Sequence, residues 1–567
     1  MTSTPGQESV NTLTGDRETP FEHLAIRDVD HVQEYVDTRL SLGSRPAADE
    51  LDESFPQALV RALSRDGHNH QHTDPQTRTV SVNSCDLEKE KGLKSDTYEE
   101  ILYVDWEEGD PRNPINYSRT RKWAITCVAS GLTGLVAAIA STYAMGYDSM
   151  IRDLNCTELQ ATAGLSLYAL GFAIFPLILA PLSEEFGRQP LYVYSTFILV
   201  LMHLGVALAK NIQSVIIFRF IAGAAGSTGS TMVGGTIADI WAPHERGVPM
   251  AVFSIAAMSA TGAGPLFAGW IAMSPHLEWR WIQWIHMIVA GILFLFVLFV
   301  MKETRSSVLL TRLAKKLRKE TNDKRYRARI EDERGSLRSL ILISCTRPCH
   351  LLLTEPVVSS FSLWVGFAWG ILYVLIESIA PAFREIHGFN TGEVGTVFVT
   401  FCIGSLFGYL TNLFFSEKLY AKNVKEKGPE ARLYAVCVAG IVFPLSMFMY
   451  AWTCFERVHW IAMCIAITLF MWSLFLIYLA VFTYLADCYG PFASSALAGQ
   501  SLCRNMAGCV FPLFTNQMYD RLGFRWANTV FACIAVLMMP IPFILFHWGP
   551  NIRAKSKFAK AVPAFGS

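Results

Sequence analysis

Long apolar stretches and short polar breaks alternate along this chain from about residue 119 to about residue 548. A helix needs about 20 consecutive apolar residues to cross the hydrocarbon core of a bilayer. Windows of that length predict twelve spanning helices, six on each side of a polar segment of about fifty residues. The predicted spans cover residues 123–145, 159–181, 190–209, 212–234, 248–272, 282–301, 352–376, 393–414, 432–452, 460–485, 494–515 and 526–547.

Composition supports a membrane protein. Of the 567 residues, 52% are hydrophobic and 17% are charged, whereas a soluble protein carries about 25% charged residues. The polar residues gather in the first 118, where Ser, Thr, Asp, Glu and His are frequent and aromatic residues are few. This composition predicts a disordered tail. The tail lacks the apolar core of a signal peptide, so we expect the first span to direct insertion.

Lys and Arg predict the orientation of the spans. The segment 302–350 carries fourteen of them, and 415–432 and 549–567 are also basic. Basic loops remain on the cytoplasmic side, which places both termini in the cytoplasm and Asn155, in an Asn-Cys-Thr sequence, in an external loop open to glycosylation. The predicted organisation is a tail (1–118), a six-helix bundle (119–301), a basic cytoplasmic loop (302–350), a second bundle (351–548) and a short tail (549–567).

Within the basic loop, residues 307–320 are predicted to form an amphipathic helix on the inner leaflet. The two bundles also show signs of an internal duplication. Span 4 closes with Asp239 as span 10 closes with Asp487, and Pro265 in span 5 corresponds to Pro512 in span 11. Transporters built from related halves place their binding site between them.

A short cytoplasmic turn between spans 2 and 3 carries several charges. Glu184 and Arg188 flank Gly187, which permits a tight reversal. Asp239 and Arg246 on the next inner loop are their expected partners. Such a cluster can lock one conformation and release it by exchanging partners. The alternative is a turn that is merely solvated.

Arg219 lies about seven residues into span 4. A charged residue at such a depth is costly and marks a functional site by default. We expect it to face a central cavity and to meet a proton carrier, a substrate anion or a carbonyl group. The structural alternative is a side chain that reaches outward to the membrane surface.

Span 5 contains the small residues Gly264 and Gly269 around Pro265. Small residues let helices pack closely, and the proline removes a backbone hydrogen bond and bends its helix. Both effects suit a helix at the seam between two moving halves.

In the second half, Trp369, Tyr373 and Glu377 share one face of span 7 at a spacing of four residues. Aromatic rings beside an acid suit an organic cation, and an interfacial aromatic belt with a solvated acid explains the stripe equally well. Further candidates for a substrate cavity are Tyr478, Phe482, Asp487, Arg504 and Asn505.

The sequence shows no pattern typical of an enzyme or a cofactor site. The thirteen cysteines have no paired spacing and several lie in apolar runs, as expected of small hydrophobic residues rather than metal ligands. No ATP-binding P-loop, zinc-binding His-Glu-x-x-His or Gly-x-Ser-x-Gly sequence occurs. We therefore expect no metal, no cofactor, no use of ATP and no nucleic-acid partner.

The chain resembles the fungal twelve-span drug:proton antiporters of the major facilitator superfamily over about residues 105–555. The resemblance rests on the segments 110–116, 181–190, 219–223, 264–265, 279–281, 484–487 and 512–519. It implies an all-helical membrane protein of two pseudo-symmetric six-helix bundles. It also implies a charge-relay role for Glu184, Arg188 and Asp239, a proton-coupling role for Arg219, and an antiporter hinge at Gly264 and Pro265.

These observations predict a secondary transporter that exports a small organic molecule in exchange for protons. A drug, a polyamine, an organic acid and a secondary metabolite all remain open as cargo. We expect a monomer that spans the plasma membrane many times. An uptake carrier on the same fold is the near alternative, and a nutrient sensor built on a transporter fold is a more distant one.

Overall fold

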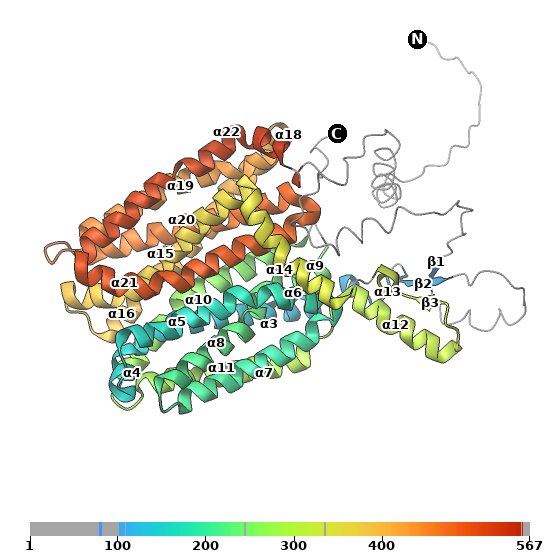
Figure 1. The fold of residues 1–567 in the computed structure, drawn as a ribbon, viewed down its shortest axis with the longest axis horizontal. Helices are drawn as coiled ribbons and strands as arrows, with labels where there is room; N and C mark the ends of the chain where they lie inside the picture. The colour runs from blue at the N-terminus through green and yellow to red at the C-terminus, as the bar shows by residue number, and fades with distance from the viewer. Residues whose placement is uncertain are drawn as a thin grey trace, which may run out of the picture. The chain divides into compact units, whose positions relative to one another are not determined.

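The computed structural model describes residues 79–81, 101–107, 109–242, 245–333, 336–556 and 558–559. All of them lie in one compact unit, Pro75–Ser567. Most of the predicted disordered tail and the end of the carboxy-terminal tail therefore lie outside the described residues. The described part is built almost entirely of helices (Figure 1).

The first six-helix bundle begins at a helix that the Ser118 hydroxyl caps by accepting a hydrogen bond from the Arg121 amide. Its spans are α3 (Arg119–Thr142), α5 (Glu158–Ile174) with α6 (Pro176–Glu185), α7 (Arg188–Leu208), α8 (Ile212–Gly226) with α9 (Thr228–Ile240), α10 (Gly247–Met273) and α11 (Glu278–Val300). Two short helices, η3 (Tyr143–Gly146) and α4 (Tyr147–Leu154), follow α3. The pair α5 and α6 bends by 41° where Pro176 begins α6.

The second bundle repeats this arrangement. Its elements are α15 (Pro356–His387), α16 (Thr391–Val397) with α17 (Val399–Thr411), η5 (Asn412–Ser416), α18 (Glu417–Lys427), η6 (Gly428–Arg432), α19 (Leu433–Thr453), α20 (Ile461–Tyr489), η7 (Gly490–Phe492), α21 (Ala493–Met538) and α22 (Pro540–Lys555). Within α21, Gly523 is not helical, with φ 72° and ψ 160°. This residue separates two spans.

Length and hydropathy support the predicted number of spans. In the described part of the chain, nine helical segments are long and apolar enough to cross a membrane, or ten with the bent pair α5 and α6. Two of them, Thr391–Thr453 and Ala493–Lys555, have 63 residues each. A single helix of that length would measure about 95 Å, about three times the hydrocarbon thickness, which is too long for one span. The first segment contains the predicted spans 393–414 and 432–452, and the second contains 494–515 and 526–547. Ten segments, two of which each contain two spans, agree with the twelve spans that the sequence predicts.

The segment between the bundles is more ordered than the predicted loop. It contains α12 (Ser306–Thr321), α13 (Arg329–Glu333) and α14 (Leu337–Thr354). The predicted amphipathic helix at 307–320 is present as α12. Three short parallel strands, β1 (Thr79–Ser81), β2 (Leu102–Asp105) and β3 (Tyr326–Arg327), lie in the order β1-β2-β3, with Thr79 paired to Tyr103 and Leu102 to Tyr326. Helix α14 packs against both α6 and α21 and so contacts both bundles.

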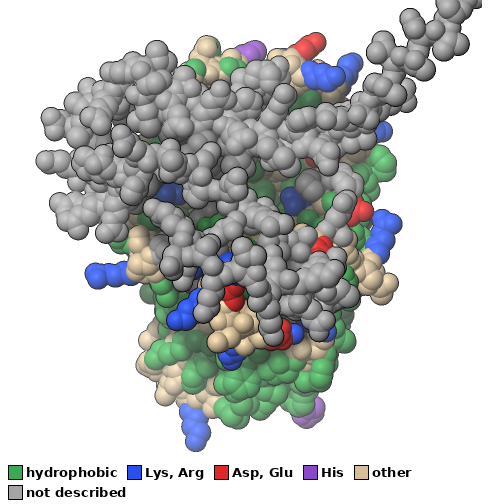
Figure 2. Space-filling view, turned by 90° about the vertical axis from the view of Figure 1, so that its right-hand side faces the viewer, with side chains coloured by type: hydrophobic (Ala, Val, Ile, Leu, Met, Phe, Trp, Pro, Cys, Tyr) green, Lys and Arg blue, Asp and Glu red, His purple; other side chains and the backbone are tan. Residues whose placement is uncertain are grey.

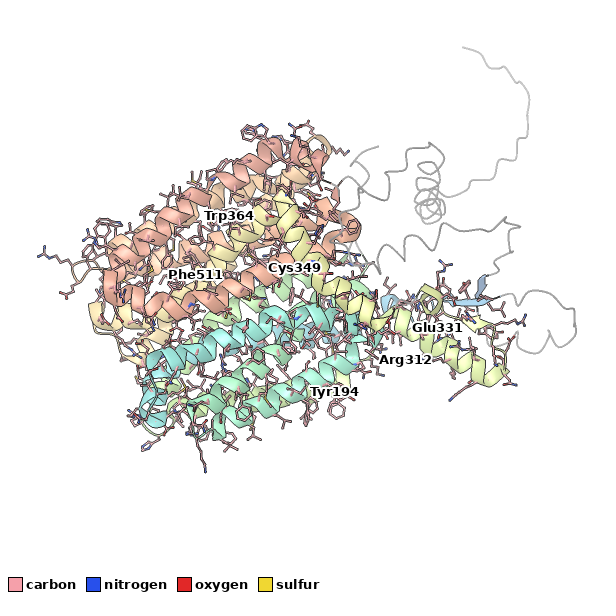
Figure 3. The ribbon with its side chains drawn as sticks, viewed as in Figure 1. Tyr194, Arg312, Glu331, Cys349, Trp364 and Phe511 are labelled. Atoms are coloured by element: carbon pink, nitrogen blue, oxygen red, sulfur yellow. The ribbon has the colours of Figure 1, made fainter. Side chains whose placement is uncertain are left out.

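Large apolar side chains cover the flanks of the bundles. Phe299 is 79% exposed and Tyr194 is 68% exposed, and Tyr194 points away from α7 into the surroundings (Figure 3). Water would penalise such a surface, whereas lipid chains cover it without cost. The exposed apolar residues are thus consistent with the predicted spans.

The two ends of the bundles differ in chemistry. We call the end that carries α14, α18, Arg188 and Asp239 the basic end, and the opposite end, with Asp148 and Arg384, the far end. Seen from the side of the basic end, scattered blue Lys and Arg side chains lie beside red Asp and Glu side chains, and green apolar ones cover the flank below (Figure 2). In the predicted orientation the basic end is cytoplasmic.

Candidate functional site

Arg219 lies inside the first bundle with no exposed surface. Its guanidinium carbon lies 4.1 Å from the centre of the Tyr143 ring and 4.5 Å from that of Tyr168. Its Nε and Nη1 donate to the carbonyl oxygens of Gly164 and Ile139, both at 3.3 Å. Two aromatic faces and two carbonyls thus stabilise the charge. Of the three expected partners, the carbonyl group is the one that contacts Arg219 here, and exposure to a cavity is not observed in this structure.

A chain of aromatic contacts leads from Arg219 to the second bundle. The rings of Tyr143 and Tyr147 meet edge to face at 5.4 Å. The Tyr147 hydroxyl donates to Glu377 Oε1 at 2.7 Å, which crosses from α4 to α15. Glu377 is 5% exposed, and α15 continues ten residues beyond it to His387. The acid is therefore a buried contact between the bundles and not a solvated group at a helix end.

Polar pairs also join the bundles closer to the far end. Arg384 in α15 donates to Asp148 Oδ2 in α4 at 2.5 Å. Asn516 in α21 donates to Glu158 Oε1 at the start of α5, at 2.8 Å. One buried apolar cluster contains Trp279 of the first bundle together with residues of the second. The far end is closed in this structure.

The small residues of α10 divide between two neighbours. A Cβ atom on Gly269 would lie 2.6 Å from the Thr391 carbonyl oxygen, and one on Gly395 would lie 2.6 Å from that of Pro265. The two backbones of α10 and α16 therefore touch across the seam between the bundles. Gly264 instead faces Thr142 in α3, within its own bundle. The predicted seam position applies to Gly269 and Pro265 but not to Gly264.

At the basic end, the charge cluster is formed by partly different residues from those predicted. Arg188 Nε donates to Asp239 Oδ2 at 2.5 Å, and Arg305 Nη1 lies 3.5 Å from Asp239 Oδ1. Glu303 Oε1 accepts the Arg188 amide at 3.0 Å. Gly187 has φ 100°, and any Cβ there would collide with the Glu303 carboxylate. A glycine is therefore required at this turn.

Two of the predicted members lie outside this cluster. Glu184 is exposed, and no hydrogen bond or ion pair joins it to another described residue. Arg246 donates to the carbonyl oxygens of Trp241 and Ala238 at 2.8 and 2.7 Å. It satisfies the carbonyls at the end of α9 and pairs with no described acid.

A similar Arg–Asp ion pair occurs at the basic end of the second bundle, as expected from the predicted duplication. Arg432 Nε donates to Asp487 Oδ2 at 2.5 Å. The carboxylate of Glu430 accepts two hydrogen bonds from Arg553 at 2.9 and 2.8 Å. Asp487 therefore belongs to an ion pair at the basic end and not to a cavity wall.

We expect Asp239→Asn to lower the free energy of unfolding by about 3 kcal/mol, because it leaves the Arg188 guanidinium buried without its counter-charge. The Arg188 and Asp239 side chains are 8% and 12% exposed. Thermal unfolding in detergent, followed by tryptophan fluorescence, measures the effect. Glu184→Gln is the exposed control, and we expect it to stay within about 0.5 kcal/mol of wild type. Equal losses in both variants would contradict this account.

The candidate cavity residues of the second bundle surround an arginine. The Arg504 guanidinium carbon lies 4.6 Å from the Trp369 ring and 5.0 Å from the Tyr478 ring, and Phe482 packs against Tyr478 at 6.3 Å. Asn505 Nδ2 donates to the Phe172 carbonyl in the first bundle at 3.3 Å. The aromatic side chains expected to receive an organic cation thus already contact a cation of the protein.

Sequence reasoning did not single out several buried polar residues. His203 in α7 and His286 in α11 have ring centres 5.3 Å apart. His203 Nδ1 lies 3.0 Å from Gln283 Oε1, and His286 Nε2 lies 3.3 Å from Thr142 Oγ1. The sequence feature that could have indicated this pair is the presence of one histidine in each of two apolar spans. Glu303 and Arg305 follow the sixth span directly, and their charges at a helix end were the signal for the basic cluster.

The described residues contain no group of three or more His, Cys, Asp or Glu side chains that could hold a metal ion. Asn155 is exposed at the end of α4, in the left-handed region with φ 46°. The glycosylation site remains a prediction.

Comparison with known proteins agrees with this architecture. A family model described as Major Facilitator Superfamily matches residues 126–512. The MFS-type efflux pump MFS2 of Trichophyton rubrum is 36% identical over 504 residues, which cover 88% of this chain and 83% of that protein. The major facilitator superfamily multidrug transporter mdrA of Aspergillus fumigatus is 34% identical over 482 residues, 84% of this chain and 78% of that protein.

A solved structure supports the fold independently. The crystal structure of a bacterial homologue of the human lysosomal transporter Spinster matches with a TM-score of 0.56 and 13% identity, and it covers 77% of this chain and 99% of that one. The helices, the two related bundles and the matches over most of the chain agree. The chain therefore belongs to the major facilitator superfamily, and it is a multi-pass membrane transporter of small molecules rather than an enzyme.

Proposed function

We propose that this protein exports a small organic molecule in exchange for protons by alternating access. The names of its relatives, an efflux pump and a multidrug transporter, support export. The observation that carries proton exchange is Glu377, a buried carboxyl group whose hydrogen bond joins the two bundles. Acidic residues inside the membrane typically mark proton pathways.

The location of Glu377 links its charge to the conformation. It is buried only while the far end is closed around Tyr147, and separation of the bundles there would expose it to water. A neutral carboxyl group costs less to bury than an ionised one. Proton binding therefore favours closure of the far end, and proton release at the basic side favours its reopening with cargo. This is the order of events that exchange requires. Two titratable groups interact with Glu377: the Tyr147 hydroxyl donates a hydrogen bond to it, and the negative charge of Glu158 disfavours its ionised form.

Arg219 supports this site from the first bundle. It stacks on Tyr143, which in turn holds Tyr147 edge to face. We propose that its proton-coupling role is to fix the Tyr147 hydroxyl against Glu377. At the basic end, the pairs Arg188–Asp239 and Arg432–Asp487 would act as the charge relay that stabilises one arrangement of helix ends over another.

We propose that the basic end faces the cytoplasm, because loops rich in Lys and Arg remain on that side. This assignment puts both termini inside and Asn155 outside, and we propose the plasma membrane as the location. Loss of a glycan-dependent mass shift in Asn155→Gln would support the orientation.

The test is transport by purified protein in proteoliposomes, with fluorescein and rhodamine 123 as probes and pyranine inside to report protons. We expect an imposed proton gradient to accelerate dye movement in wild type, and Glu377→Gln to lose about tenfold or more of that acceleration. Its side chain can no longer exchange a proton.

Glu355→Gln provides a matched control. Glu355 is also a buried carboxyl group of the second bundle, and it accepts a hydrogen bond from the Tyr489 hydroxyl at 3.1 Å. Both partners belong to the same bundle, so we expect gradient-driven transport to persist. If the proton gradient accelerates dye movement in Glu377→Gln as much as in wild type, the proposal is wrong. If dye movement is instead driven by a proton gradient of the opposite direction, the protein is an uptake carrier.

A further inference from the structure

The centre of the second bundle carries a buried positive charge without a counter-charge. Arg504 in α21 is 8% exposed, and no described acidic side chain forms an ion pair with it. Its Nη2 donates to Ser501 Oγ at 3.3 Å, while its Nε is buried without a partner. Buried charges in proteins are normally paired. An unpaired guanidinium donor is a site at which an anion gains a strong hydrogen bond.

Neighbouring side chains on the same helix add hydrogen-bond donors. Gln500 lies one turn before Arg504, is 2% exposed, and has an Nε2 without a partner. Asn505 Nδ2 points to the first bundle, where it meets the Phe172 carbonyl. Arg504 and Gln500 thus place two buried, unused donors on one face of α21, one turn apart. No acceptor among the described residues satisfies them.

The first bundle presents a similar charge. Arg219 has no exposed surface, and its Nη2 is also buried without a partner. In the second bundle, Tyr373 of α15 packs against Gly508 of α21, one turn beyond Arg504. Arg219 in the first bundle and Arg504 in the second are thus both buried guanidinium groups with an unused donor, and neither forms an ion pair with a described residue.

We propose that the cargo is an aromatic organic anion, a carboxylate or phenolate, and that Arg504 with Gln500 binds its charged group. The rings of Trp369 and Tyr478 beside Arg504 offer the apolar surface for the rest of such a molecule. This inference rests on the proposed export function and specifies its substrate class. An organic cation would meet repulsion from Arg504 at the aromatic residues that otherwise suit it.

The two xanthene dyes supply the test because they share a ring system and differ in charge at neutral pH. Fluorescein is an anion and rhodamine 123 is a cation. Binding to wild-type protein in nanodiscs, measured by fluorescence polarisation, should favour fluorescein by about tenfold or more. Arg504→Gln should abolish this preference, and Arg504→Lys, which keeps the charge, should retain part of it.

Arg525→Gln is the matched control. Arg525 also stacks on aromatic rings, 4.0 Å from Trp452 and 4.7 Å from Phe455, and its Nε is likewise buried without a partner. It lies near the far end, at the turn after Gly523, and its loss should leave the preference between the dyes unchanged. A merely structural role of Arg504 would instead weaken both dyes equally.

Three results would overturn the proposal: preference of the wild type for rhodamine 123, binding of neither dye, or an unchanged preference in Arg504→Gln. The outcome is distinguishable from failure of proton exchange. Binding of fluorescein without gradient-driven movement would retain the anion site and reject proton exchange. Gradient-driven movement of rhodamine 123 in preference to fluorescein would retain proton exchange and reject the anion site.

Discussion

Replacement of Arg219 by methionine is expected to abolish gradient-driven transport while the protein remains folded. Methionine fills much of the same volume, and exchange of a buried charge for an apolar side chain is often neutral or stabilising. Transport should fail because Tyr143 loses the guanidinium 4.1 Å from its ring centre, and with it the support of Tyr147. We expect a reduction of about 100-fold, which corresponds to about 2.7 kcal/mol.

Two measurements on one sample separate function from folding: the temperature of unfolding in detergent and dye transport in proteoliposomes. Arg347→Met is the control, because Arg347 also lies over an aromatic ring, 5.6 Å from Phe492, in α14 outside the bundles. We expect it to transport normally. A stable Arg219→Met protein that retains transport would remove Arg219 from the mechanism.

The depth of Arg219 in an apolar span was readable from the sequence, but its surroundings were not. Tyr143 contacts it from η3, directly after α3, and Tyr168 contacts it from α5, and neither tyrosine stands out within its own span. Packing between helices decides which polar side chains meet, and periodicity within a single helix carries no information on that choice. The contact of Tyr147 with Glu377 was hidden for the same reason.

The charge cluster shows a second limit. Glu184 and Arg246 lie close to Arg188 and Asp239 along the chain, and that proximity favoured them as partners. In the structure Glu184 remains exposed while Arg305, from the end of the sixth span, reaches Asp239. The matched pair Arg432 and Asp487 could be anticipated in part, since the duplication already aligned Asp239 with Asp487.

The spans themselves were predictable because about 20 apolar residues suffice to cross the membrane. Their interruptions were less so. The break between α8 and α9 at Ser227 has no proline, and Gly226 at the end of α8 does not have a positive φ. The polar segment 302–350 was expected to be mainly a loop, yet α14 forms within it because it packs against both α6 and α21.

Gly269→Ala is expected to shift the protein from the closed to the open arrangement of the far end. The added methyl group would lie 2.6 Å from the backbone oxygen of Thr391 in the other bundle. Backbone cannot move aside as a side chain can, so closure should become less favourable by about 1–3 kcal/mol. Since about 1.4 kcal/mol is a factor of ten, the ratio of closed to open protein should fall by about 5-fold to 150-fold.

Double electron–electron resonance spectroscopy can measure the separation of the bundles. Spin labels are attached at Leu159 and Leu522, both exposed near the far end, in a chain whose native cysteines are replaced. The distribution should move to longer distances in Gly269→Ala. Gly264→Ala is the control on the same helix, because its methyl group would meet Thr142 Cγ2 at 2.8 Å within the first bundle. That contact is present whether the far end is open or closed, so the variant should lose stability without a change in distance. Equal distributions for Gly269→Ala and wild type would mean that the close approach of α10 and α16 does not control closure, and that the ion pair and hydrogen bonds around Arg384 and Glu377 determine it instead.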